Sequence, residues 1–140
     1  MRYLLDTNVL SEPARPDPDP RVLAWLGAQA QIDVAISVIT LGEIGRGVDL
    51  LAPGRRRTRL REWLEVDVPR RFHERVLPID DRVARAWGRL SAEAERKGRR
   101  LPALDGLLLG TAAVHDLVFV TRNERDCADR GVPILNPWGA

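Results

Sequence analysis

Residues 3–8 read Tyr-Leu-Leu-Asp-Thr-Asn, a short apolar run that ends at the carboxylate of Asp6. An apolar run without polar alternation is typical of a strand in a parallel sheet with both faces covered. An acid beside core-forming residues must be paired, hydrogen-bonded or bound to a metal, because an isolated buried carboxylate is energetically costly. This stretch therefore predicts a buried strand with a functional acid at its carboxyl end.

The rest of the chain alternates similar apolar runs with segments of helical spacing. Besides residues 2–5, we expect strands at residues 32–37, 76–79, 117–120 and 134–135. The helical patterns lie at residues 21–28, 40–51, 58–66, 81–97 and 103–115. This alternation predicts an α/β fold with a central, mainly parallel sheet. Because the chain has 140 residues and no linker or internal repeat, we expect a single domain over residues 1–140.

The composition indicates an ordinary globular protein, with 44% hydrophobic and 30% charged residues. No apolar run is long enough to cross a bilayer, and no signal peptide opens the sequence. Cys127 is the only cysteine and the chain has two histidines, which excludes a disulfide framework and argues against a thiolate or histidine metal site. We therefore expect a cytoplasmic protein without membrane attachment.

Three further acids share the apolar setting of Asp6. Glu43 and Asp105 lie in apolar segments with helical spacing, and Asp126 follows a late apolar run. Each acid has an ordinary explanation when taken alone: an N-cap, a first-turn acid or, for Glu43 with Thr40, a capping box. Open parallel sheets bind their ligands beyond the carboxyl ends of the strands, where these four acids can converge. Together they predict one shared divalent-metal site.

Small hydroxyl and amide residues flank the acids at both strand ends, namely Thr7, Asn8, Thr121 and Asn123. Such groups orient carboxylates and metal-bound waters. Carboxylates without histidine or thiolate partners favour a hard cation, so the expected cofactor is Mg²⁺, with Mn²⁺ as a substitute.

Arginine is concentrated in short clusters, although the net charge is only +2. Such clusters are candidates for contacts with an RNA backbone, here through Arg55, Arg56, Arg57, Arg99 and Arg100. Lys97 is the only lysine, so arginine is the general cation of this chain, and solvated faces explain the clusters equally well.

Four motifs, in order, make the sequence similar to the PIN-domain ribonucleases, in particular to the toxins of VapBC-type toxin–antitoxin modules and the FitB group. The motifs lie at residues 4–9, 37–47, 104–113 and 120–126, so the resemblance extends over essentially the whole chain. It implies a PIN-like α/β/α sandwich and an Mg²⁺-dependent endoribonuclease that hydrolyses RNA. It also implies a homodimer and a cognate antitoxin protein that blocks the active site and binds operator DNA.

The resemblance further assigns roles to the acids. Asp6, Glu43 and Asp105 match the acidic triad of the family, and Asp126 matches its fourth acid. We expect Asp6 and Asp105 to bind the metal directly and Asp126 to bind it directly or through water. Glu43 is the candidate that orients or deprotonates the attacking water. The positions that support the site or contact the substrate correspond to Thr7, Asn8, Thr121 and Asn123.

Two other interpretations use the same acids. A receiver-like signalling domain also gathers acids and Mg²⁺ at the ends of parallel strands. It requires an acidic pair on the first strand and a lysine near the last, which Asp6 and Lys97 do not supply. The second alternative is a PIN fold kept as a binding module without activity, against which the intact set of acids argues.

Overall fold

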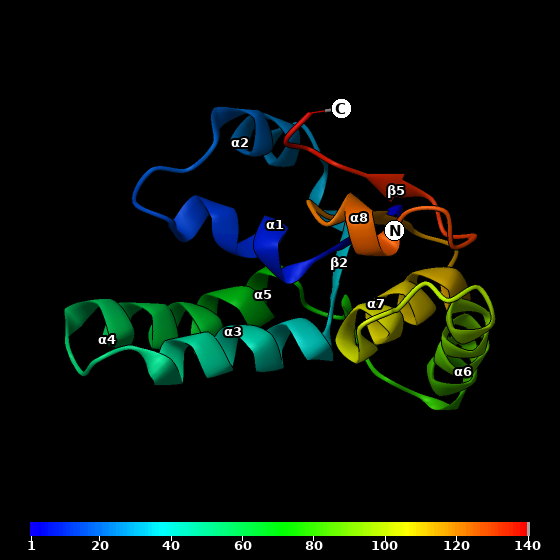
Figure 1. The fold of residues 1–140 in the computed structure, drawn as a ribbon. Helices are drawn as coiled ribbons and strands as arrows, with labels where there is room; N and C mark the ends of the chain where they lie inside the picture. The colour runs from blue at the N-terminus through cyan, green and yellow to red at the C-terminus, as the bar shows by residue number, and fades with distance from the viewer. Residues whose placement is uncertain (140) are drawn as a thin grey trace.

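The computed structural model describes residues 1–139 and has a parallel sheet at its centre (Figure 1). Its strands are β1 (Tyr3–Leu5), β2 (Val34–Ser37), β3 (Val76–Leu77), β4 (Val118–Val120) and β5 (Ile134–Leu135). They follow the order β3-β2-β1-β4-β5 across the sheet, and the pairings are parallel. The predicted α/β fold is confirmed, with the opening apolar run as the central strand.

Helices cover both faces of the sheet. One layer comprises α1 (Thr7–Ser11), α2 (Pro20–Gly27), α3 (Val38–Leu50), α4 (Arg55–Glu62) and α5 (Val68–Arg71). The other comprises α6 (Asp81–Arg96), α7 (Ala103–Val114) and α8 (Glu124–Cys127). Successive side chains of a strand point to opposite faces. Leu5 of β1 therefore packs in the core of the first layer and Leu4 in the core of the second, which completes an α/β/α sandwich.

The helix that carries Asp105 is fixed by a close crossing with α6. A Cβ atom added to Gly106 would meet Trp87 Cδ1 at 2.7 Å, and one added to Gly110 would meet the carbonyl oxygen of Val83 at 3.1 Å. Glycine at these two positions lets α7 approach α6 this closely. Because Gly106 follows Asp105 in the chain, the crossing also fixes where this acid enters the site.

The start of α3 differs from the prediction. The helix expected at residues 40–51 begins at Val38, and Ser37 is its N-cap, with the Ser37 hydroxyl accepting the Ile39 amide at 3.0 Å. The capping-box interpretation of Thr40 and Glu43 is therefore wrong, because Thr40 lies inside the helix. Glu43 is left without a capping role, which strengthens the case for a functional one.

Other boundaries shift in smaller ways. The strand expected at residues 32–37 begins only at Val34, because a 3₁₀ turn, η2 (Gln31–Asp33), precedes it. The helix expected at residues 58–66 begins earlier, as α4, and continues through the π-helical segment η3 (Trp63–Asp67) into α5. A further 3₁₀ turn, η1 (Glu12–Ala14), follows α1. Among residues 1–139, no helix has the length and apolar character needed to span a membrane. That residues 1–140 form a single domain stays a prediction.

Candidate active site

The carboxyl ends of the two central strands place Asp6 beside Thr121. Asp6 follows β1 and Thr121 follows β4, and these strands are paired in parallel. The Thr121 hydroxyl donates a hydrogen bond of 2.7 Å to Asp6 Oδ2, and the Thr7 amide donates one of 2.7 Å to Asp6 Oδ1. Both oxygens of this buried carboxylate therefore have fixed donors, so the fold sets its orientation.

Glu43 joins this arrangement through Thr7. The Thr7 hydroxyl donates a hydrogen bond of 2.6 Å to Glu43 Oε1, which ties α1 to α3. The backbone amide of Thr7 thus holds Asp6 while its side chain holds Glu43. Glu43 Oε2 makes no hydrogen bond with any of the described residues, so this oxygen is available to accept one from water.

Asn123 connects the two remaining acids. Its Nδ2 donates to Asp105 Oδ2 at 3.3 Å and to Asp126 Oδ2 at 3.1 Å, and its Oδ1 accepts the Asp126 amide at 3.3 Å. The backbone N–H of Asn123 in turn donates to Thr121 Oγ1 at 3.0 Å. A series of hydrogen bonds therefore leads from Asp6 through Thr121 and Asn123 to both late acids.

The acids perturb one another electrostatically. Burial raises the pKa of Asp6 to about 6. Its hydrogen bonds from Thr121 and Thr7 oppose that rise, and the negative charges of Asp105 and Glu43 add to it. Burial also raises the pKa of Asp105, together with the nearby charges of Asp126 and Glu43. Carboxylates that raise the pKa of a neighbour repel one another when ionised, and a bound cation relieves that repulsion.

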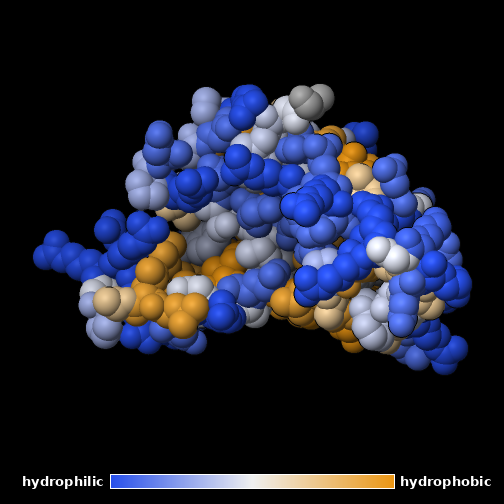
Figure 2. Space-filling model, viewed as in Figure 1, coloured by the Kyte–Doolittle hydropathy of each residue, from blue (hydrophilic) through white to orange (hydrophobic). Residues whose placement is uncertain are grey.

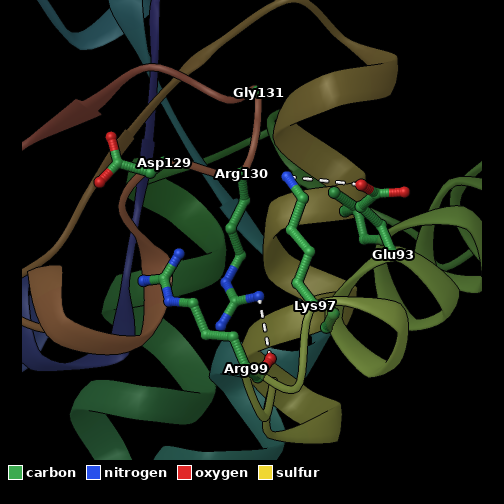
Figure 3. Close-up of a pocket in the computed structure, with 8 residues that line it drawn as sticks. Glu93, Lys97, Arg99, Asp129, Arg130 and Gly131 are labelled. Carbon is green, nitrogen blue, oxygen red and sulfur yellow. Dashed lines mark hydrogen bonds and ion pairs between the residues drawn. The ribbon is translucent and has the colours of Figure 1, made fainter.

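Two arginines, Arg99 and Arg130, hold the segment that carries Asp126. Figure 3 shows both side chains and the hydrogen bond from Arg130 to the Arg99 carbonyl. Arg130 donates from Nε to the carbonyl oxygen of Asp126 at 2.5 Å and from Nη1 to that of Arg99 at 3.4 Å. Arg99 donates to the carbonyl oxygens of Ala128 at 2.6 Å and Arg125 at 2.8 Å. These contacts bind α8 to the chain just before α7, the helix of Asp105. Both terminal nitrogens of Arg99 are thus engaged with backbone.

The structure brings together most of the residues that the sequence predicts for the site. The four acids are linked to Thr7, Thr121 and Asn123, as described above. Asn8 is not part of these hydrogen bonds, and its buried Oδ1 has no hydrogen-bond partner among the described residues. Arg55, Arg56 and Arg57 form the first turn of α4, and Arg100 is exposed. Whether any of these arginines contacts RNA stays a prediction.

Sequence reasoning missed Arg130 and Glu12. Arg130 lies close enough to Asp105 for its positive charge to oppose part of the rise in the pKa of that acid. Glu12 is 2% exposed and accepts hydrogen bonds from Arg15 and from the Asp19 amide, both at 3.0 Å. An acid followed three positions later by an arginine was a visible signal for the Glu12 pair. Arg130 had no comparable signal in an arginine-rich chain.

The donor set fits a hard divalent cation. It consists of carboxylates supported by hydroxyl and amide groups, which suits Mg²⁺ or Mn²⁺. Within residues 1–139, no group of three acids, histidines or cysteines is close enough to enclose an ion by itself. Mg²⁺ is commonly held by one or two carboxylates and keeps several waters, so a few direct ligands suffice.

A five-strand parallel sheet with acids gathered at its carboxyl edge is the arrangement expected of a PIN domain. The model of the PIN domain family matches residues 3–130, and the chain belongs to this family. It is 40% identical to the toxin FitB from Neisseria gonorrhoeae, covering 96% of this chain and 97% of FitB. It is 36% identical to a VapC ribonuclease from Sinorhizobium fredii, covering 96% of each chain.

Solved structures give the same assignment. The crystal structure of FitAcB from Neisseria gonorrhoeae matches with a TM-score of 0.94 and 39% identity over 99% of each chain. The crystal structure of DNA-bound VapBC from Salmonella typhimurium matches with a TM-score of 0.80 and 26% identity over 98% of each chain. The predicted resemblance to the VapC and FitB group is confirmed.

Proposed function

We propose that the chain is an Mg²⁺-dependent endoribonuclease and the toxin component of a VapBC-like toxin–antitoxin system. The observation that carries this proposal is the series of hydrogen bonds that links Glu43, Asp6, Asp105 and Asp126 at one edge of the sheet. The VapC ribonuclease among the relatives supports the same chemistry. Membership of the PIN family favours a nuclease over a receiver-like domain.

Hydrolysis of an RNA phosphodiester needs a water that is nucleophilic at neutral pH and a counter-charge for the phosphate. When bound by Asp6 and Asp105, and by Asp126 directly or through water, Mg²⁺ supplies Lewis-acid polarisation of water and phosphate. Glu43 accepts a hydrogen bond from the attacking water at Oε2 and takes its proton as the water oxygen bonds to phosphorus. The bond from phosphorus to the leaving ribose oxygen breaks, and that oxygen takes a proton from solvent water. Thr7 holds Glu43 at the other carboxylate oxygen, which keeps Oε2 for that water.

The proposal includes a protein partner and a homodimer in the cytoplasm. Similar solved structures are named as FitAcB and as DNA-bound VapBC. A small antitoxin that covers the acids and binds operator DNA accords with those names. Four carboxylates give the site a negative potential, and an arginine of the antitoxin would pair with them through charge-assisted hydrogen bonds. A toxin dimer would let one antitoxin dimer engage two toxins.

A cleavage assay on purified protein tests the activity. Wild-type chain should cut single-stranded RNA with Mg²⁺ or Mn²⁺ and should be inactive in EDTA, and Asp105→Asn should be inactive with metal. A chain that binds RNA without cutting it would be a binding module. A chain that accepts a phosphoryl group from a small phosphodonor would be receiver-like.

A further inference from the structure

A groove leads away from Glu43, between α1 on one side and α3 and α4 on the other. Its inner part is a cavity of about 290 Å³ that meets the site at Thr7 and Glu43. Its outer part, a cavity of about 360 Å³, shares Arg56, Leu60 and Trp63 with the inner part and continues along α4. Figure 2 shows this hollow, with hydrophobic surface along it and hydrophilic surface at its borders. The groove therefore runs directly out of the candidate active site.

Arginines accompany the groove along its length. Arg15 lines the inner cavity, Arg56 lines both cavities and Arg59 lines the outer one. Arg56 and Arg59 are exposed and make no side-chain hydrogen bond or ion pair with the described residues. Arg15 donates from Nη1 to the buried carboxylate of Glu12 at 3.0 Å, which fixes its position. The groove thus has cations at intervals beside an apolar wall.

The aromatic residue of the apolar wall, Trp63, lies where the regular helix α4 ends. Trp63 follows the last residue of α4 and opens the π-helical segment η3. Its side chain packs against the core of the first layer, yet it remains partly exposed and lines both cavities. Short π-helical segments inside α-helices are frequent at functional sites.

We infer that this groove binds the single-stranded RNA segment next to the cleaved bond and selects its nucleotides, an inference that rests on the proposed ribonuclease activity. Bases of single-stranded RNA stack on aromatic and apolar surfaces, and their phosphates pair with arginine. The apolar wall with Trp63 matches the bases. Arg56 and Arg59, which have no acidic partner among residues 1–139, match the phosphates of the backbone. A strand in this groove reaches Glu43 at its inner end.

Binding is measured with a short fluorescein-labelled single-stranded RNA of random sequence, in the Asp105→Asn background so that no cleavage occurs. Arg56→Gln and Arg59→Gln should each lower the slope of log K against log salt by about 0.7, and together by about 1.4. Arg89→Gln on α6 removes another exposed arginine, outside the groove, and should leave the slope unchanged. If Arg56→Gln and Arg59→Gln show the same salt slope as Arg89→Gln, the inference is overturned. If they weaken a complex with the partner protein instead, the groove belongs to that protein.

Sequence preference is measured on the active chain with a pool of RNAs. Trp63→Phe keeps an aromatic face and should cut at the wild-type positions. Trp63→Leu keeps the apolar packing without stacking, and should change relative cleavage rates between sites by about tenfold or more. Identical cleavage patterns for both variants would overturn the inference. If the wild-type chain cuts no RNA, the proposed ribonuclease function itself fails. If it cuts RNA but the variants leave the salt slopes and the cleavage patterns unchanged, only the RNA-binding role of the groove is refuted.

Discussion

Thr121 and Asp6 lie 115 positions apart in the sequence and share a hydrogen bond of 2.7 Å in the protein interior. The bond joins the residue after β4 to the residue after β1, at the point where the two central strands end. It fixes one oxygen of the most buried of the four acids, so it couples the integrity of the sheet to the geometry of the site.

Replacing this donor should destabilise the protein. Thr121→Val removes the hydroxyl and leaves Asp6 Oδ2 without its buried donor, at a cost of about 1.5–3 kcal/mol. The measurement is urea unfolding in EDTA. Thr111→Val is the matched control, because Thr111 is equally buried but donates to the Leu107 carbonyl within its own helix. Equal losses in the two variants would contradict a special role for the Thr121–Asp6 bond.

The raised pKa of Asp6 predicts that this side chain contributes less to the stability of the metal-free protein as the pH rises. The folded-state pKa is about 6, above the ordinary value of 3.8, so the folded state binds more protons between these values. The stabilisation is fully present below 3.8 and is lost as the pH passes through 6, with a total of about 3 kcal/mol. Asp105 acts in the same direction, because its pKa is also raised.

Unfolding free energies in EDTA, measured from about pH 4 to about pH 8, test this sign. Asp6→Asn cannot ionise at this position, so it should be more stable than wild type at the upper end and should show a flatter profile. If the stability difference between Asp6→Asn and wild type does not grow with pH over this interval, the assigned pKa is contradicted.

Metal binding should relieve the repulsion between the acids and so stabilise the folded protein. Mg²⁺ or Mn²⁺ should raise the wild-type melting temperature, because a ligand that binds only the folded state stabilises it. Asp105→Asn should lose this increase and lower cleavage by at least about 100-fold, since a developing phosphate charge then lacks its counter-ion. Glu95→Gln on α6 neutralises an exposed acid outside the site and is the control. A full metal response in Asp105→Asn would remove this acid from the ligand set.

Arg130 should matter for the local order of α8 as much as for overall stability. Its guanidinium donates to the Asp126 carbonyl at 2.5 Å and to the Arg100 carbonyl at 2.9 Å, so Arg130→Gln should cost about 2 kcal/mol. Amide exchange should accelerate in α8. Arg130→Lys should not restore the protection of α8 against amide exchange, because one ammonium group cannot reproduce the planar, forked set of donors of the guanidinium. Arg96→Gln, which breaks an exposed pair with Glu93, should leave both measurements unchanged.

The sheet and the acids could be predicted because their signals are local. The apolar runs of β1 and β4 are continuous in sequence, and an acid after a buried strand stands out against its neighbours. The alternation of Leu4 and Leu5 between the two cores also follows from strand geometry alone. Convergence of the acids follows once the strands are parallel, because their carboxyl ends share one edge.

The supporting contacts could not be predicted, because they depend on backbone atoms that only the fold brings together. Arg99 and Arg130 bind carbonyl groups, which every residue has, so no residue type marks the contact. Ser37, rather than Thr40, caps α3 because β2 ends at Ser37 and fixes where the helix begins. The groove beside Trp63 likewise needs the relative placement of α1 and α4.

The toxin assignment predicts a phenotype in a bacterial host. Expression of the chain alone should stop growth, and co-expression of the adjacent gene should restore it, because an antitoxin would cover the acids. Asp6→Ala and Glu43→Ala remove one acid each and should be harmless. Thr121→Val keeps all four acids and removes only the hydroxyl that supports Asp6. Residual toxicity of this variant would therefore distinguish the loss of an acid from the loss of its hydrogen bond. Equal effects of wild type and Asp6→Ala on growth, or an adjacent gene whose product does not bind, would refute the toxin assignment while leaving the ribonuclease proposal to the cleavage assay.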